Sequence, residues 1–358
     1  MHSPAADDPA LLALFWPFQT GELTLAEDPV LFLGARPGPW TAIHRQHAWQ
    51  CEQPHRPLYE ALQAQRIPVG DEVSGGDFPV TLLLPTRQRD ESRALLARAV
   101  SATRAGGLVV AAAANRDGAR SLQADLEALA GPVHSLSKHK CRVLWIHVEP
   151  ARINAELCEQ WLALAQVCQV DIGQETFWSR PGLFAWDRVD AASALLASQL
   201  PPTLAGRVAD AGAGWGYLSM QLARQCPGVT TIDLFEANAR ALAPARRNLD
   251  QVLASLAGRT PPAVTVHWHD VAAGLPGGFD AVVCNPPFHQ GHGGAEVPHL
   301  GQAFIASAAQ ALSRDGQLWL VANRQLPYEG LLGERFKQVR SVLQQGGYKV
   351  LQASGPRP

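Results

Sequence analysis

The sequence predicts an α/β protein made of two tandem Rossmann-like domains, the second closed by an antiparallel C-terminal hairpin. Strand-length apolar segments alternate with helix-type segments along the chain, as in doubly wound sheets. A glycine-rich turn follows the first strand of the C-terminal half, and the N-terminal half repeats segments of the C-terminal half. We therefore expect domains at residues 1–150 and 177–358, with residues 151–176 as a connector.

Composition agrees with this organisation. The chain has 358 residues, 47% of them hydrophobic, which is enough for two ordinary cores. The longest apolar stretches, such as residues 108–114, have the length of a strand and are too short to span a membrane. The acidic start lacks a cationic signal region, and the six cysteines show no Cys-x-x-Cys spacing. These features predict a cytoplasmic protein with buried thiols and no membrane partner.

The glycine-rich turn lies at residues 207–216, where a short strand leads to a helix expected at about 217–224. Glycines let the backbone approach a ligand closely, and the helix N-terminus faces that ligand. The acid within the motif suits a cationic ligand such as S-adenosylmethionine better than a phosphate, although a nicotinamide-cofactor loop has similar glycines. The candidate cofactor residues of this turn are Asp210, Gly212, Gly214 and Gly216.

Two further acids follow predicted strands. Glu236 closes a strand at residues 229–235, where a carboxylate can hold both ribose hydroxyls of a nucleoside; Asp233 is the runner-up. A helix is expected at about 239–256 and a third strand at 263–267. Beyond that strand Asp270 is a candidate acceptor for the adenine amine, with a helix cap or turn as the alternative role.

The most informative stretch is Asn-Pro-Pro-Phe-His at residues 285–289, after a buried strand at 279–284. An exocyclic amine is a poor nucleophile, because its lone pair is delocalised into the ring. The Asn285 side-chain oxygen and the Pro286 carbonyl can accept its two N–H groups, and Phe288 can stack on the ring. The consecutive prolines hold these acceptors in place. An ordinary strand-ending turn is the alternative interpretation.

The C-terminal half resembles the bacterial ribosomal RNA guanine-N2 methyltransferases of the small-subunit RsmC and large-subunit RlmG type. This resemblance implies S-adenosylmethionine as the methyl donor, a guanine amine as the acceptor and in-line displacement. Phe184, Asp190 and Asn285 are further candidate cofactor residues, and Pro287 and His289 are candidate substrate residues. A purely structural role is an equal alternative for His289. The matching residues are 181–184 with Asp187 and Asp190, 210–216, 284–289 and 321–328.

An internal repeat explains the N-terminal half. Three pairs of segments align: 78–85 with 279–286, 104–110 with 314–320, and 30–38 with 208–216. In the first copy Phe32 replaces Asp210, Arg36 replaces Gly214 and Leu84 replaces Asn285. The first domain is thus expected to be a degenerate methyltransferase fold, for which the resemblance implies substrate positioning or stabilisation. Chance similarity of short apolar strands is the alternative.

The end of the chain and the domain linker complete the expected elements. Segments 337–343 and 348–353 flank a Gln-Gln-Gly-Gly turn and predict the closing hairpin. A helix at about 190–200 is expected to lead into the cofactor domain.

The charge balance is unusual for an RNA-binding protein, since the net charge is −2. Lys138, Lys140 and Arg142 form the candidate RNA-contacting cluster, with a solvated face as the alternative. The histidine pairs 267/269 and 289/292 could hold an ion, but a substrate loop or a surface position explains them better, so no metal site is expected.

The resulting hypothesis is a monomeric enzyme that methylates ribosomal RNA, free or in a ribosomal subunit. The small-subunit 16S rRNA is slightly favoured over the large-subunit 23S rRNA. Two other classes stay open: a protein glutamine N-methyltransferase, since an amide fits the same acceptors, and a ribosome-assembly factor with little turnover. The intact Asp210, glycines and Asn285 favour an enzyme over the assembly factor.

Overall fold

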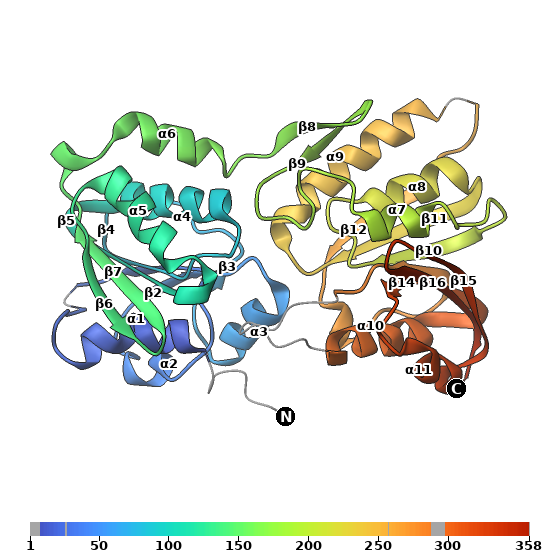
Figure 1. Ribbon diagram of the computed structural model, residues 1–358, viewed down its shortest axis with the longest axis horizontal. Coiled ribbons are helices and arrows are strands. Elements are labelled where there is room, and N and C mark those ends of the chain that lie inside the picture. The colour runs from blue at the N-terminus through green and yellow to red at the C-terminus, as the bar shows by residue number, and fades with distance from the viewer. Residues whose placement is uncertain (1–7, 26, 257, 288–297, 358) are drawn as a thin grey trace. The chain divides into compact units, whose positions relative to one another are not determined.

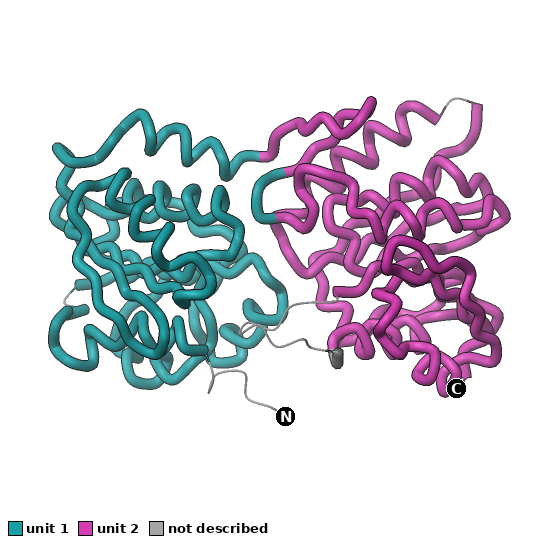
Figure 2. The backbone as a smooth tube through the Cα atoms, in the orientation of Figure 1, with its two compact units in different colours: residues 1–166, 180–182 teal, residues 167–179, 183–358 magenta. Residues whose placement is uncertain are grey.

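The computed structural model describes residues 8–25, 27–256, 258–287 and 298–357. The chain forms two compact units, shown in different colours in Figure 2. The first comprises residues 1–166 with 180–182, and the second 167–179 with 183–358. Each unit is built on its own seven-stranded sheet.

The sheet of the first unit has the strand order β3-β2-β1-β4-β5-β7-β6 (Figure 1). Its strands are β1 (Val30–Leu33), β2 (Trp49–Glu52), β3 (Val69–Gly70), β4 (Phe78–Leu83), β5 (Thr103–Ala114), β6 (His134–Lys138) and β7 (Cys141–His147). The helices are α1 (Pro9–Gln19), α2 (Trp40–Ile43), α3 (Arg56–Ala64), α4 (Arg89–Ala102), α5 (Ala119–Ala130) and α6 (Ala155–Ala163), with 3-10 turns η1 (Asn115–Asp117) and η2 (Pro150–Arg152).

The sheet of the second unit has the equivalent order, β12-β11-β10-β13-β14-β16-β15. Its strands are β10 (Ala205–Ala211), β11 (Gly228–Glu236), β12 (Ala263–Trp268), β13 (Phe279–Cys284), β14 (Leu312–Asn323), β15 (Phe336–Gln345) and β16 (Tyr348–Pro356). The helices are α7 (Ala191–Ala197), α8 (Tyr217–Gln225), α9 (Ala239–Ser255), α10 (Pro298–Ala311) and α11 (Tyr328–Arg335), with 3-10 turn η3 (Val271–Ala273). A separate hairpin, β8 (Cys168–Ile172) and β9 (Glu175–Ser179), precedes them.

These two sheets confirm the predicted fold class. In both, five parallel strands build the centre, and an antiparallel pair (β6–β7 or β15–β16) closes one edge. The strands of the repeat also pair in the same register, since Val30 lies opposite Val80 and Val208 opposite Ala281.

The third repeat segment is one residue out of step with its predicted alignment. The pairing sets Leu108 opposite Val80 and Gln317 opposite Ala281, so that Leu108 corresponds to Gln317 and not to Leu318. The physical reason is that these strands are buried on both faces. Their near-continuous apolar sequence carries no alternation to fix the register.

Residues 151–176, predicted as a connector, contain regular structure. Helix α6 packs within the first unit, where the Arg93 guanidinium lies 5.2 Å from the centre of the Trp161 ring. Strand β8 belongs to the second unit.

Both sheets carry helices on both faces, as parallel strands require. In the second unit α7, α8 and α9 bury Leu196, Leu222 and Leu249 on one face, while α10 and α11 bury Ile305 and Leu332 on the other. The six cysteines are free and all but Cys168 are buried, as predicted. Within the described residues, no helix combines the length and the apolar character that crossing a membrane requires.

Candidate active site

The glycine-rich turn follows β10 and leads into α8. Gly212, Gly214 and Gly216 have φ angles of +78°, +56° and +93°, a region that side-chain-bearing residues rarely adopt. A Cβ on Gly212 would lie 3.2 Å from Cε1 of Phe304, whereas one on Gly214 would meet no described atom within 4 Å. The backbone at Gly214 is therefore open to a ligand, as the motif predicts.

Asp210 lies at the end of β10 and is fully buried. Its Oδ2 accepts hydrogen bonds from the Ser219 backbone N (3.0 Å) and hydroxyl (2.7 Å), so it secures the first turn of α8. Its Oδ1 is buried without a hydrogen-bond partner among the described residues. Burial raises the pKa of Asp210 to about 7, against the opposing effect of the Ser219 bonds.

Glu236 lies at the carboxyl end of β11 and is half-buried. Its Oε2 accepts from Gly214 N (2.8 Å) and its Oε1 from Asn238 N (2.7 Å), so the carboxylate is fixed beside the glycine turn. Burial raises its pKa. The runner-up, Asp233, is instead held in ion pairs with Arg207 (2.9 Å) and His267 (2.8 Å). Of these two acids, Glu236 is the one that reaches the glycine turn.

Asp270 caps η3, because its Oδ1 accepts from the Ala272 backbone N at 2.9 Å. This is the capping role that the sequence left open as the alternative. A contact with adenine stays a prediction for this residue.

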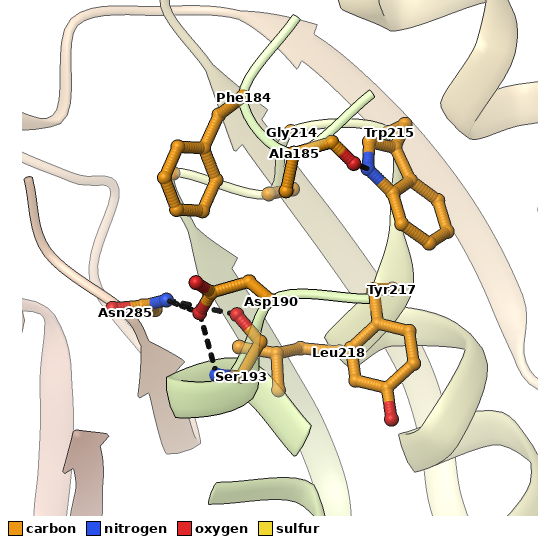
Figure 3. A pocket seen from close by; sticks show the side chains of 11 residues that line it. Phe184, Ala185, Asp190, Ser193, Gly214, Trp215, Tyr217, Leu218 and Asn285 are labelled. Carbon is orange, nitrogen blue, oxygen red and sulfur yellow. Dashed lines mark hydrogen bonds between the residues drawn. The ribbon is translucent and has the colours of Figure 1, made fainter. Parts of the chain in front are cut away.

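A pocket lies between the glycine turn, the loop before α7 and the end of β13 (Figure 3). One wall carries Phe184, whose side chain is 62% exposed although it is large and apolar. Its neighbour Ala185 has a φ of +47°, and the Ala185 carbonyl accepts from the Trp215 indole N–H at 3.2 Å. The lining residues are Phe184, Ala185, Asp190, Ser193, Gly212, Ala213, Gly214, Trp215, Tyr217, Leu218 and Asn285.

The amide of Asn285 is held by two hydrogen bonds, drawn in Figure 3. Its Nδ2 donates to Oδ2 of Asp190 (2.9 Å) and to Oγ of Ser193 (2.8 Å). The same Asp190 oxygen also accepts from Ser193 N (2.9 Å) and thereby caps α7. Asn285 Oδ1 is buried and has no partner among the described residues. The amide is thus oriented with an unpaired acceptor, which is what the predicted recognition of an amine requires.

Ser193 is a residue that the sequence reasoning missed. It lies 92 residues from Asn285 in the chain, and a serine within an alanine-rich helix gives no signal of its own. Asp190, expected to contact the cofactor, lines the pocket and orients Asn285. Pro286 and Pro287 follow β13 as predicted, while Phe288 and His289 lie outside the described residues.

The cationic cluster of the first unit lies on the β6–β7 hairpin. Lys138 Nζ lies 3.7 Å from the centre of the Trp16 ring, and Arg142 Nη1 donates to Gln123 Oε1 (2.6 Å). Lys140 is exposed at the hairpin turn. Among the described residues, no group of three or more His, Cys, Asp or Glu side chains could hold a metal ion, and His292 lies outside them.

A glycine turn after the first strand, an acid at the end of the second and Asn-Pro-Pro after the fourth define a class I methyltransferase domain. The model of the methyltransferase small domain family matches residues 174–352. The chain belongs to the family of ribosomal RNA small subunit methyltransferases C, and its relatives extend over both units.

Several relatives that carry this name match over most of the chain, and two of them are at least 30% identical to it. The protein of Sodalis glossinidius is 31% identical over 300 residues, covering 83% of this chain and 80% of its own. That of Aeromonas hydrophila is 30% identical over 306 residues, covering 82% and 84%. Among solved structures, the T. thermophilus 16S rRNA N2 methyltransferase (RsmC), in complex with AdoMet and guanosine, matches with a TM-score of 0.79. It is 25% identical and covers 98% of this chain and 92% of its own.

Proposed function

We propose that this protein transfers the methyl group of S-adenosylmethionine to the exocyclic N2 amine of a guanine in 16S ribosomal RNA. The observation that carries the proposal is the oriented Asn285 amide, whose Oδ1 is buried and unpartnered at the end of β13. An enzyme built to receive an N–H donor leaves an acceptor free in this way. The family relationship supports the guanine and the small subunit.

The mechanism follows from where the acceptors lie. Asn285 Oδ1 and the Pro286 carbonyl accept the two N–H groups of the guanine amine, which turns its lone pair out of the ring plane. S-adenosylmethionine supplies an electrophilic methyl group on a sulfonium. The N–C bond forms as the C–S bond breaks, the electron pair passes to sulfur, and the amine then loses a proton to water. Proximity and fixed dipoles account for the rate, and no strong general base is required.

The cofactor is assigned to the glycine turn and its acids. The open backbone at Gly214 and the unpartnered Asp210 Oδ1 fit a cationic amino-acid moiety, and Glu236 fits the ribose hydroxyls. Phe184 and Asp190 would border its methionine end, and Asp270 would accept the adenine amine. Phe288 is assigned to stacking on the guanine, with Pro287 and His289 beside it.

We assign the first unit to substrate positioning and stabilisation. Lys138, Lys140 and Arg142 on the β6–β7 hairpin are the proposed RNA contacts, at a surface where Lys140 is exposed. The protein is proposed to act as a monomer in the cytoplasm, on 16S rRNA free or in the small subunit.

The deciding experiment is methyl transfer from labelled S-adenosylmethionine to separated ribosomal subunits and to free 16S and 23S rRNA from a strain lacking the gene. Mass spectrometry of the nucleosides identifies the product. We expect N2-methylguanosine in 16S rRNA. The same nucleoside in 23S rRNA would move the assignment to the large subunit. Label on protein, and none on any RNA, would replace the proposal with a glutamine methyltransferase.

A further inference from the structure

One buried amide outside the pocket connects three segments of the second unit. Asn248 lies on α9 and is 2% exposed. Its Oδ1 accepts from Trp178 N (2.6 Å), and its Nδ2 donates to Trp178 O (2.8 Å) and to Trp215 O (2.9 Å). Both polar atoms of the amide are therefore used: the oxygen binds β9, and the nitrogen binds both β9 and the glycine turn.

Trp215 links Asn248 to the wall of the pocket. It stands between Gly214 and Gly216, both at positive φ, so its carbonyl belongs to the turn that presents backbone to the ligand. Its indole N–H donates to the Ala185 carbonyl. Ala185 itself has a φ of +47°, a conformation that alanine holds only when its surroundings impose it.

The glycine turn is fixed at its other positions as well. Gly214 N donates to Glu236, and a Cβ on Gly216 would lie 3.4 Å from Ala245, one turn before Asn248 on α9. Asn248 is the polar side chain on α9 that holds the turn through Trp215. Without it, the part-buried carbonyl of Trp178 and the buried carbonyl of Trp215 would each lose a donor.

We propose that Asn248 is a positioning residue for the cofactor. It holds the glycine turn in one conformation. Through the Trp215–Ala185 hydrogen bond it also holds the pocket wall formed by Phe184 and Ala185. The inference rests on the proposed function, because it assigns the cofactor to this turn. Substitution of such a residue lets the turn adopt several conformations and thereby lowers the affinity for S-adenosylmethionine.

Asn248→Asp is the sharpest change. Aspartate keeps the shape and the acceptor for Trp178 N, but it replaces the donor with an acceptor that faces two carbonyls. Val252→Ala is the matched control, since Val252 is 2% exposed on the same helix and core but makes no contact of this kind. Thermal melts report stability, and calorimetry on the full chain reports the S-adenosylmethionine Kd without RNA.

We expect Asn248→Asp to raise the Kd at least roughly tenfold, with kcat at saturating cofactor within about threefold of the unsubstituted protein. Val252→Ala should lower Tm yet leave the Kd within about twofold. A Kd for Asn248→Asp within twofold of the original, or an equal rise in Val252→Ala, would overturn the inference. An unsubstituted protein that binds no S-adenosylmethionine would instead refute the proposed function.

A second variant decides the matter should Asn248→Asp not fold. Trp215→Phe keeps an aromatic ring and the backbone carbonyl that Asn248 binds, and removes the hydrogen bond to Ala185 together with part of the buried volume of the indole. We expect its Kd to rise roughly three- to tenfold, as the loss of one buried hydrogen bond implies. A Kd within twofold would show that the Ala185 link does not position the cofactor and would overturn the inference.

Discussion

The two units place different chemistry at the same position of the same strand. In the second unit Asp210 is fully buried and bonded to Ser219. In the first unit Phe32 is equally buried, but its ring packs 5.3 Å from that of Trp40 and 6.0 Å from that of Phe15. In the first unit an aromatic cluster therefore packs at the strand position where the second unit has a carboxylate bonded to a serine. Packing replaces a buried acid, whose desolvation is costly.

The end of the second strand shows how much of the site the first unit has kept. The Ala35 N–H donates to the Glu52 carbonyl, and the equivalent Ala213 N–H donates to the Phe235 carbonyl. The next residue in each unit, Gln53 or Glu236, therefore holds the same position. Gln53 Oε1 accepts from the backbone N two residues on at 2.9 Å, as Glu236 does at 2.7 Å.

The remaining bond at this position is reversed. Gln53 Nε2 donates to the Ala35 carbonyl (2.6 Å), whereas Glu236 accepts from Gly214 N. The glycine of the turn is itself replaced by Arg36, which pairs with Asp8 at 2.7 Å. The first unit has therefore kept the backbone scaffold and lost its charged, ligand-facing groups. The scaffold does not need the acids, which supports the proposal that they bind the cofactor in the second unit.

The largest effect is expected at Asn285 and its counterpart Leu84. Asn285→Ala removes the oriented acceptor and should lower kcat about 10²- to 10³-fold, with the S-adenosylmethionine Kd within about fivefold. Leu84→Ala, at a position 2% exposed in the first unit, should cost about 2–5 kcal/mol of stability and leave kcat per cofactor-binding molecule unchanged. Steady-state kinetics with calorimetry measures both. Retention of more than about a tenth of kcat by Asn285→Ala would remove the catalytic distinction between the units.

The second prediction concerns the buried acid. The pKa of Asp210 is raised from its ordinary 3.8 to about 7, so its favourable contribution is complete below the ordinary value and is lost as pH rises through about 7. The stability of the unsubstituted protein relative to Asp210→Asn should therefore fall by about 2–3 kcal/mol between about pH 5 and pH 8. Denaturant unfolding at both pH values measures the difference.

Phe32→Leu provides the control, because no group titrates at that position of the first unit. Its effect on stability should be the same at both pH values. Asp210→Asn should also weaken S-adenosylmethionine binding roughly 10- to 100-fold at neutral pH, the cost of losing a charge-assisted interaction. A pH-independent difference for Asp210→Asn would mean that the carboxyl titrates normally in the folded protein.

Part of the fold and of the candidate site could be predicted from the sequence. The succession of strands and helices along the second unit, the positions of Asp210 and Glu236 at strand ends, and the missing groups at Phe32, Arg36 and Leu84 follow from motif order and the repeat. Local patterns carry that information, because a strand and the turn after it are adjacent in the chain.

The contacts that could not be predicted from the sequence join residues that are far apart in the chain. The Ser193–Asn285 bond, the Asn248 clamp and the equivalence of Gln53 with Glu236 appear only once the sheet brings their elements together. The ion pairs of Asp233 with Arg207 and His267, which favour Glu236 as the acid for the ribose, likewise join residues far apart in the chain.

The third prediction compares two exposed apolar side chains, one in each unit. Phe184 is 62% exposed at the pocket and Ile43 is 53% exposed on α2. Phe184→Ala should raise KM for S-adenosylmethionine or RNA roughly three- to tenfold, the worth of one aromatic contact. Ile43→Ala should change neither KM nor kcat. Equal effects of the two substitutions would show that the exposed ring of Phe184 has no ligand-binding role.

The smallest effect is expected at the two closing hairpins. Lys140 lies in the turn of β6–β7, and Lys337 is exposed on β15 of the equivalent hairpin. Lys140→Gln should weaken binding to the small subunit roughly two- to fivefold and reduce the slope of log affinity against log salt by about one, because one phosphate contact is lost. Lys337→Gln should leave that slope unchanged. A loss of affinity confined to Lys337→Gln would place the RNA on the hairpin of the second unit. The first unit would then have a stabilising role alone, because its fold would be kept for packing and not for RNA recognition.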